Sequence, residues 1–395
     1  MDLARARFLV SARGRDALVG LDSGLAALPL HRLSAVLRES WAPAEAAALA
    51  EQVTLSAKAR ERFGDSPLAL YSPGGLEMMT HPLVAGRRAA RLASFGLPVL
   101  DLTCGIGGDL AAVAATGVRT AGLERDRPTA LLAAVNVPEA ALACGDATRP
   151  PFVLSRHAVV LDPSRRGGGT RAFDPRAFTP PWDVTISLAE SAAAAVVKGP
   201  PGIDRRHLPA TAEVEFVQLG RGLRECAVWF GGDAVGGLRR AVLLPAGEEL
   251  TSEAPEAPAE TVPPGPFILD PESCVTRAGL VRHLAYRTGA RMMDPEVAYL
   301  AAVEPVFDPL CATFEVMETV EFSIARLRNL LKARGWRPDE IRRRAFPVEP
   351  DELRRLLGTL MGERVTLLCT TLGGRRLVFV ARRLFPAGFA PGEIA

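Results

Sequence analysis

The sequence is poor in the residues that build metal sites and disulfide frameworks. Its six cysteines and five histidines are scattered over 395 residues, and no two of them have the close spacing of zinc ligands. The first residues lead into no apolar run of the kind found in secretion signals, so we expect none, and no stretch is long and apolar enough to span a bilayer. We therefore expect a cytoplasmic protein without a metal and without a membrane partner.

Charge is nearly balanced over the whole chain but unevenly distributed. The net charge is +2. Between residues 321 and 385, however, 15 Lys or Arg side chains stand against 7 Asp or Glu, an excess of eight positive charges. Residues 246–262 contain five glutamates, two prolines and no basic residue. This composition predicts an acidic, Pro-rich extended linker over residues 246–265.

Length and pattern predict further domains on both sides of this linker. Residues 1–95 are rich in amphipathic helical segments, which predicts a mainly helical N-terminal domain. In residues 96–245, short apolar runs alternate with helical runs, which is typical of a parallel sheet covered by helices on both faces. Residues 266–395 mix helical and strand-like runs and predict a basic α+β domain. The expected strands of the middle domain are 98–102, 118–123, 140–143, 157–161 and 193–197, followed by a closing antiparallel pair at 214–219 and 226–230.

A glycine-rich stretch, VLDLTCGIGGD at residues 99–109, lies at the end of the first expected strand. Glycines allow a sharp turn and a close approach of ligand to backbone, and ligands of α/β sheets bind at this edge. The second half of the dinucleotide fingerprint is absent, and no Gly-Lys-Ser/Thr follows, so a P-loop is excluded. The acid before the loop, Asp101, is more typical of S-adenosylmethionine sites, where a carboxylate can face the methionine ammonium.

Further acids follow the later strands. Glu124 ends the second strand, where a carboxylate can bind both ribose hydroxyls. Asp146 follows the third strand and would reach the adenine amine; a simple turn is the alternative. The candidate cofactor-binding residues are Asp101, Thr103, Gly105, Gly107, Glu124 and Asp146.

The fourth strand ends in Asp162-Pro163, where a substrate acceptor should lie. The Asp162 carboxylate and the Pro163 carbonyl can hold an amine and orient its lone pair. Arg165 and Arg166 can bind phosphate or stack on a base, or form a solvated turn. The turn after the fifth strand adds Lys198 and Pro200 as a candidate wall of the acceptor pocket, with a purely structural turn as the alternative.

The sequence resembles the class I S-adenosylmethionine-dependent methyltransferases. More narrowly, it is similar to a bacterial methyltransferase family that carries a C-terminal THUMP-like domain. The resemblance is carried by residues 71–82, 101–109, 162–166, 198–204, 270–272, 277–281 and 341–344. It implies a Rossmann-like sheet, S-adenosylmethionine as cofactor, the cofactor residues named above, and Asp162-Pro163 with Arg165 as the catalytic acceptor motif.

THUMP-type domains imply RNA as a partner, and the local positive excess agrees with phosphate contact. Arg342, Arg343 and Arg344 are candidate RNA contacts, or alternatively a solvated face. We therefore expect methylation of tRNA or rRNA at a base nitrogen. Arg165 stands where base-modifying amino-methyltransferases usually have an aromatic residue that stacks on a flipped base, although an arginine can itself stack on a base. No cysteine follows the fifth strand, which argues against covalent C5 chemistry.

Two other functions share parts of this pattern. One is a methyltransferase of a protein or small molecule, which would use the same cofactor half. The other is a non-catalytic RNA-binding protein with a methyltransferase fold. The sequence leaves the modified nucleotide and the oligomeric state open.

Overall fold

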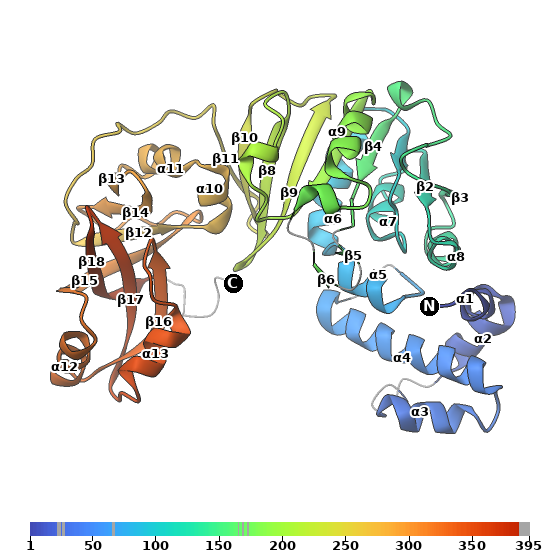
Figure 1. The fold of residues 1–395 in the computed structure, drawn as a ribbon, viewed down its shortest axis with the longest axis horizontal. Coiled ribbons are helices and arrows are strands. Elements are labelled where there is room, and N and C mark those ends of the chain that lie inside the picture. The colour runs from blue at the N-terminus through green and yellow to red at the C-terminus, as the bar shows by residue number, and fades with distance from the viewer. Residues whose placement is uncertain are drawn as a thin grey trace. The chain divides into compact units, whose positions relative to one another are not determined.

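The computed structural model describes residues 1–21, 25, 28–64, 68–164, 166–167, 170–171 and 174–386. The chain divides into two compact units (Figure 1). The first unit contains Met1–Glu213 and Ala227–Gly237, and the second contains Val214–Cys226 and Leu238–Ala395.

The first unit begins with helices only, as the sequence predicts. They are α1 (Leu3–Val10), α2 (Ala12–Gly20), α3 (Leu30–Leu37), α4 (Pro43–Phe63), α5 (Pro73–Met78) and α6 (Pro82–Ser94). Proline at the first position starts α4 with a preset φ, and Gly64 ends it at a φ of 71°, a conformation that glycine adopts without steric cost. Leu49 and Leu55 of α4 are buried against the neighbouring helices.

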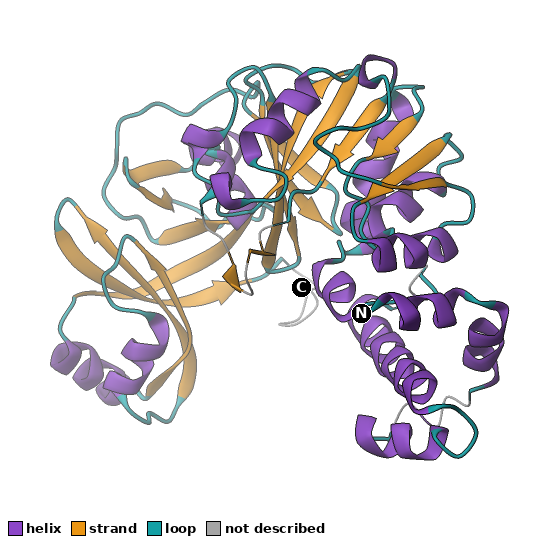
Figure 2. Ribbon diagram, turned by 45° about the vertical axis from the view of Figure 1, so that its right-hand side comes forward, coloured by secondary structure: helices purple, strands orange, loops and turns teal. Residues whose placement is uncertain are grey.

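A parallel sheet follows in the order β7-β4-β1-β2-β3. Figure 2 draws strands in orange and the helices beside them in purple. Its strands are β1 (Val99–Asp101), β2 (Thr120–Glu124), β3 (Ala141–Cys144), β4 (Ala158–Leu161) and β7 (Ala194–Gly199). The intervening helices are α7 (Gly108–Ala114), α8 (Arg127–Asn136) and α9 (Trp182–Glu190), and the short strands β5 (Arg166–Gly167) and β6 (Thr170–Arg171) pair after β4. β1, β4 and β7 are buried along their whole length, which explains why they are apolar up to Asp101 at the end of β1 and Lys198 near the end of β7.

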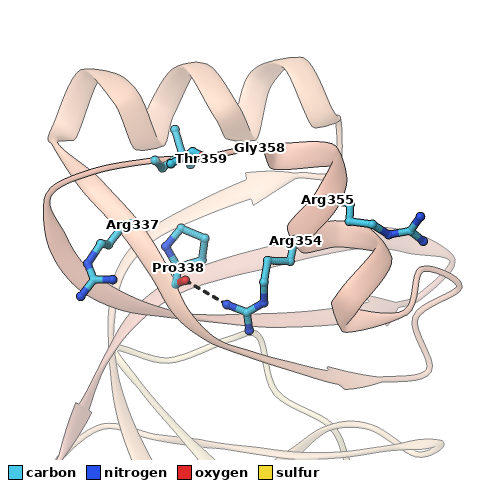
Figure 3. Close-up of a pocket in the computed structure, with 7 residues that line it drawn as sticks. Arg337, Pro338, Arg354, Arg355, Gly358 and Thr359 are labelled. Atoms are coloured by element: carbon cyan, nitrogen blue, oxygen red, sulfur yellow. Dashed lines mark hydrogen bonds between the residues drawn. The ribbon is translucent and has the colours of Figure 1, made fainter.

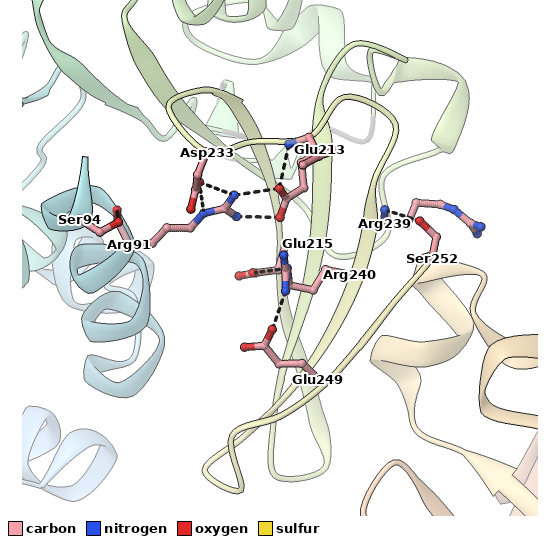
Figure 4. A network of polar contacts seen from close by, with 10 residues as sticks. Arg91, Ser94, Glu213, Glu215, Asp233, Arg239, Arg240, Glu249 and Ser252 are labelled. Carbon is pink, nitrogen blue, oxygen red and sulfur yellow. Dashed lines mark hydrogen bonds and ion pairs between the residues drawn. The ribbon is translucent and has the colours of Figure 1, made fainter. Parts of the chain in front are cut away.

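An arginine of α6 binds acidic side chains from the last segments of the same unit, residues 213 and 227–237 (Figure 4). Arg91 forms ion pairs of 2.8 Å with Glu213 and with Asp233, and its guanidinium lies over the ring of Trp229. Glu213 is buried, so its charge is stabilised by this bidentate pairing.

The second unit contains strands that the sequence pattern did not reveal. β8 (Glu213–Leu219) and β9 (Gly222–Gly231) match the expected pair, but β10 (Arg239–Leu244) and β11 (Glu248–Thr251) follow them. β11 occupies part of the segment for which an extended linker was expected, and the irregular connector begins after it. β11 is an edge strand, and Glu249 on it pairs with Arg240 of β10 at 2.7 Å (Figure 4). Its acids are therefore those of a charged sheet edge.

The remainder of the second unit is α+β, as expected. A seven-stranded sheet has the order β13-β14-β12-β15-β18-β17-β16. Its strands are β12 (Phe267–Pro271), β13 (Arg291–Asp294), β14 (Val297–Ala302), β15 (Cys311–Glu321), β16 (Trp336–Arg344), β17 (Glu363–Leu372) and β18 (Arg375–Leu384). The helices are α10 (Ser273–Ala278), α11 (Val281–Thr288), α12 (Ile324–Arg334) and α13 (Pro350–Leu357). Leu327 and Leu331 of α12 share one core with Leu353 and Leu357 of α13. Within the described ranges, no helix has the length and apolar character needed to cross a membrane.

Candidate active site

Three predicted acids lie at the carboxyl ends of neighbouring parallel strands. Asp101 ends β1, Glu124 ends β2, and Asp162 follows β4. The loop after β1 touches both neighbours. Gly105 donates its backbone N–H to Glu124 Oε2 at 3.1 Å, and Asp162 donates its backbone N–H to Thr103 Oγ1 at 2.6 Å. The structure thus brings these five predicted residues together at one sheet edge.

The glycine loop needs its glycines for two different reasons. Gly105 and Gly107 have φ values of 55° and 95°, the left-handed region that disfavours a Cβ. A Cβ at Gly107 would also lie 2.9 Å from Val137 Cγ2, so the loop backbone packs directly on α8. A Cβ at Gly105 would instead meet nothing within 4 Å. The side of the loop at Gly105 therefore has open space for a ligand.

Asp101 is a buried carboxyl group without an ion pair among the described residues. It is 3% exposed, and its Oδ1 accepts the N–H of Thr103 at 3.0 Å. Burial, reinforced by the negative charge of Asp109, raises the pKa of Asp101 to about 8. A cationic group bound beside it would favour the ionised form. The amino group of S-adenosylmethionine is such a cation, so the site fits this cofactor.

Lys198 lies in a buried polar network that the sequence did not reveal. This β7 side chain is 8% exposed, and its Nζ donates to Thr80 Oγ1 at 2.7 Å, Asp109 Oδ2 at 2.8 Å and Asp162 Oδ2 at 2.5 Å. An ammonium group has three N–H donors, and three side-chain oxygens of the protein match them. The prediction placed Lys198 in the wall of the acceptor pocket, but its charge fixes two carboxylates of the protein itself.

Arg88 completes this buried network from helix α6. It is 3% exposed and forms an ion pair with Asp109, which also accepts a hydrogen bond of 3.1 Å from Thr80. Burial alone would raise the pKa of Asp109, but the charges of Arg88 and Lys198 outweigh it and hold that pKa well below its usual range. The helical N-terminal region therefore supplies Thr80 and Arg88 to the base of the site.

Sequence reasoning missed Thr80, Arg88 and Asp109 as members of this network. One signal was present: Val84, Arg88 and Leu92 follow one another at intervals of four residues, which places the arginine on the buried face of α6. A buried arginine requires a paired acid. The identity of that acid was not visible, because Asp109 lies 21 residues further along the chain.

Asn136 is another buried polar residue that the prediction missed. Its amide accepts the N–H of Leu70 at 2.8 Å and donates to the carbonyls of Leu70 and Ile106, both at 2.8 Å. Ile106 belongs to the glycine loop. The last residue of α8 thus ties the segment before α5 to the loop, and every one of these hydrogen bonds is buried.

Helix α5 packs directly on the glycine loop. Ser72 caps it by accepting the N–H of Gly75 at 3.1 Å. A Cβ added at Gly75 would lie 2.6 Å from Ile106 Cγ2, and one at Gly108 would lie 3.0 Å from Met79 Cγ. In the sequence, residues 71–82 have neither a helical nor a strand pattern. Their conformation is explained by this close contact with the loop.

The loop that follows β4, where the sequence predicts the acceptor motif, is anchored to the chain after it but only partly described. Ser164 exchanges backbone hydrogen bonds of 2.7 and 2.9 Å with Thr179. The predicted residue Arg165 and the side chain of Arg166 lie outside the described residues. Pro200 accepts the N–H of Ile203 at 3.0 Å in the turn after β7.

Asp146 forms a local turn. It is exposed and accepts hydrogen bonds from the backbone N–H and the hydroxyl of Thr148, at 2.8 and 2.9 Å, which lower its pKa. These bonds define an Asx turn, the alternative that the sequence had left open. The Asx turn is compatible with the predicted contact to the adenine amine, since the carboxylate of Asp146 has lone pairs left to accept a further donor.

The three consecutive arginines of β16 are ion-paired inside the second unit. Arg342 and Arg344 flank the buried Asp270 at 2.7 and 2.8 Å, and Arg343 pairs with Glu349. Asp270 and these arginines belong to two separate stretches that carry the family resemblance. The structure shows that the stretches contact each other and that Arg342 and Arg344 neutralise the buried charge of Asp270.

Comparison with known proteins identifies the family. Over 272 residues, the chain is 35% identical to an uncharacterized S-adenosylmethionine-dependent methyltransferase of Mycobacterium tuberculosis, found in strains CDC 1551 and H37Rv, with 67% of this chain and 74% of that protein covered. The chain belongs to the S-adenosylmethionine-dependent methyltransferases. S-adenosylmethionine is its cofactor and methyl transfer is its reaction, as predicted.

Two further comparisons concern the architecture of this methyltransferase. A family model described as THUMP domain-like matches residues 311–383, from β15 to β18. A protein of Porphyromonas gingivalis W83, assigned as a methyltransferase, has a crystal structure that matches with a TM-score of 0.73 at 21% identity, covering 98% of this chain and 100% of that one. The predicted fold class, a Rossmann-like methyltransferase with a THUMP-like domain, is confirmed.

Proposed function

We propose that this methyltransferase modifies a base nitrogen of tRNA or rRNA. The observation that carries the proposal is the state of Asp162. One of its carboxylate oxygens is held by the buried Lys198, while the side chain is 40% exposed and Oδ1 accepts no hydrogen bond from the described residues. A fixed carboxylate with one oxygen left for an amine is suited to orienting an amino or imino group.

The cofactor residues are proposed from their places around the glycine loop. Asp101 would face the ammonium group, and Gly105 and Gly107 would let the cofactor approach the loop backbone. Glu124 ends β2, where ribose hydroxyls bind in such sheets. Its two oxygens accept the N–H groups of Gly105 and Asp126, which fixes the carboxylate and leaves lone pairs for the ribose. Thr103 would act by holding Asp162, and Asp146 would accept from the adenine amine.

The transfer itself requires positioning more than chemical activation. S-adenosylmethionine supplies the methyl group when bound. Asp162 and the Pro163 carbonyl accept hydrogen bonds from the acceptor nitrogen and direct its lone pair toward the cofactor side of the sheet edge. Asp162 is half-exposed, so the proton lost from the nitrogen can pass through its carboxylate to water.

Two features support RNA as the acceptor. The THUMP-like match covers residues 311–383, and the surrounding region carries the excess of basic residues found from the sequence. We assign catalysis to residues 96–245 with support from residues 1–95, and RNA contact to residues 266–395, beyond the irregular connector that follows β11. All six cysteines are free thiols, which suits the cytoplasm, where RNA substrates occur.

The test is methyl transfer from tritiated S-adenosylmethionine to fractions from cells that lack this protein. We expect label in tRNA or rRNA with the native enzyme, and a loss of at least about 100-fold with Asp162→Ala, in keeping with the cost of misplacing an acceptor. Cofactor affinity of the variant should stay within a few-fold of the native value. Label that appears in protein or in small molecules, and not in RNA, would contradict the proposal and support the alternative substrate classes.

A further inference from the structure

A pocket rimmed by arginines lies in the THUMP-like region, within the second unit (Figure 3). It has a volume of about 360 Å³ between β16 and the end of α13. Its lining contains three arginines and no carboxylate: Arg337, Pro338, Arg354, Arg355, Gly358, Thr359 and Leu360.

The charges around this pocket are not neutralised by the protein. Arg337, Arg354 and Arg355 form no ion pair within the part of the chain that the structure describes. Arg354 donates only to the backbone carbonyls of Pro338 and Asp339, at 3.4 Å each, which orients its guanidinium without cancelling its charge. The contrast with Arg342, Arg343 and Arg344 is direct, because each of those pairs with an acid.

A fourth arginine, Arg328, lies close to the pocket. The partial negative charge at the C-terminal end of α13 is too small to neutralise these arginines. A Cβ placed at Gly358 would lie 3.7 Å from Arg328 Nη2, so a guanidinium of α12 reaches the same corner. The C-terminal end of a helix carries about half a negative charge. Acids lie nearby in the same elements: Asp339 pairs with Arg364, and Asp351 and Glu352 stand in the first turn of α13. None of these acids forms an ion pair with a pocket arginine among the described residues, so the guanidinium groups remain available to an anion.

We propose that this pocket binds a backbone phosphate of the RNA substrate. The planar guanidinium fork matches two phosphate oxygens at once. The hollow is wider than a lone phosphate ion needs, and Pro338 and Leu360 add an apolar wall against which a neighbouring sugar can pack. The inference rests on the proposed function, and it places RNA contact at Arg337 and Arg355 in addition to, or in place of, the paired arginines of β16.

The experiment compares two double variants that remove equal charge from the same domain. Arg337→Gln with Arg355→Gln alters the pocket. Arg375→Gln with Arg376→Gln alters the β17–β18 hairpin, where both side chains are exposed. Fluorescence anisotropy measures the Kd for unfractionated tRNA from 50 to 300 mM salt. We expect the pocket variant to weaken binding about tenfold or more and to lower the salt slope by about 1 to 2, while the hairpin variant changes Kd less than about threefold.

Several results would overturn the inference. Equal weakening by both double variants would show a diffuse charge effect, and unchanged binding by the pocket variant would exclude the pocket while leaving the proposed function intact. Micromolar binding of inorganic phosphate alone by calorimetry, without competition from tRNA, would show a free-anion site instead. If native protein binds S-adenosylmethionine but no RNA, the proposed function fails, and this inference fails with it. Unchanged thermal melting and cofactor affinity establish that the variants are folded.

Discussion

The buried ammonium of Lys198 lies 2.5 Å from Asp162 Oδ2. The parallel pairing of β4 with β7 creates this contact, since Leu161 lies opposite Val197 in the register. Asp162 directly follows Leu161 in the chain, and Lys198 directly follows Val197, so both lie at the carboxyl edge of the sheet. The half-exposed carboxylate of Asp162 is thereby held by the Lys198 ammonium group, which also donates to Asp109 and Thr80. Under the proposed function, Lys198 would be a positioning residue that acts on the acceptor through Asp162.

Replacing Lys198 with methionine keeps the length of the side chain but removes its charge. Breaking a buried ion pair by removing one partner costs about 3–5 kcal/mol; because Arg88 still compensates Asp109, we expect a loss nearer about 3 kcal/mol in the free energy of unfolding. Methyl transfer should fall more than cofactor affinity, because Asp162 loses its orientation. Chemical denaturation and single-turnover rates measure the two effects. Lys58→Met, at an exposed position on α4, is the matched control; equal behaviour of the two variants would contradict the role given to Lys198.

Cofactor binding should depend on pH through Asp101. Burial raises the pKa of this carboxyl to about 8, and the ionised form is the one that attracts an ammonium group. Affinity for S-adenosylmethionine should therefore increase with pH up to about 8, by at most about tenfold per pH unit. Calorimetry between pH 6 and 9 tests this on native protein and on Asp101→Asn. The variant should bind weakly with a flat profile, and a flat profile for the native enzyme would contradict the account.

The same group affects stability with the opposite trend. The pKa of Asp101 in the folded protein lies above its unfolded value of 3.8, so the folded state binds more protons between about pH 4 and 8. The stabilisation is complete below the unfolded pKa and is lost as pH rises through about 8. Without cofactor, the stability difference between native protein and Asp101→Asn should therefore shift in favour of the variant as pH rises. A difference that stays constant from pH 5 to 9 would show that Asp101 titrates normally.

The contact between α5 and the glycine loop can be tested with two adjacent glycines. A Cβ at Gly75 would collide with Ile106 Cγ2 at 2.6 Å, whereas one at Gly74 meets nothing within 4 Å. Gly75→Ala should cost about 1–3 kcal/mol through overpacking and weaken cofactor binding by displacing the loop. Gly74→Ala should be neutral or slightly stabilising. Thermal melting and calorimetry measure both, and indistinguishable variants would show that α5 does not constrain the loop.

The paired arginines of β16 give a prediction for the second unit. Asp270 is buried between Arg342 and Arg344, so Asp270→Asn leaves two half-buried cations without their shared anion. We expect a loss of about 3 kcal/mol in stability. Asp351→Asn, at an exposed position on α13, should change stability by less than about 0.5 kcal/mol. A stable Asp270→Asn variant with weakened RNA binding would instead favour a direct RNA-binding role for these arginines.

The strands that could be predicted best from the sequence are those whose burial requires a run of apolar residues. β1, β4 and β7 are buried throughout, so they appear as short apolar runs that only Asp101 and Lys198 interrupt, near the strand ends, and the glycine loop between β1 and α7 has a recognisable composition. β16 could not be read in this way. Its residues include Asp339, Glu340 and Arg342 to Arg344, and they form a strand because β17 and the distant Asp270 compensate them. A window of local sequence contains neither partner.

The site shows the same division. Asp101, Glu124 and Asp162 were predicted because strand ends are visible in the sequence. The polar network beneath them was not, because Thr80, Arg88 and Lys198 are spread over more than a hundred residues and meet only in the folded chain. Helix α5 is explained by a tertiary contact, since its short glycine-containing sequence has little helical propensity of its own.

The most direct test of the central claim, methylation of an RNA base nitrogen, is a mass-spectrometric comparison of nucleosides. tRNA and rRNA are purified from cells with and without this protein, and from cells that carry Asp162→Ala in its place. The account predicts the loss of one N-methylated nucleoside in the deletion strain and in the variant strain, with recovery when the native gene is restored. Identical nucleoside profiles in all strains would contradict it.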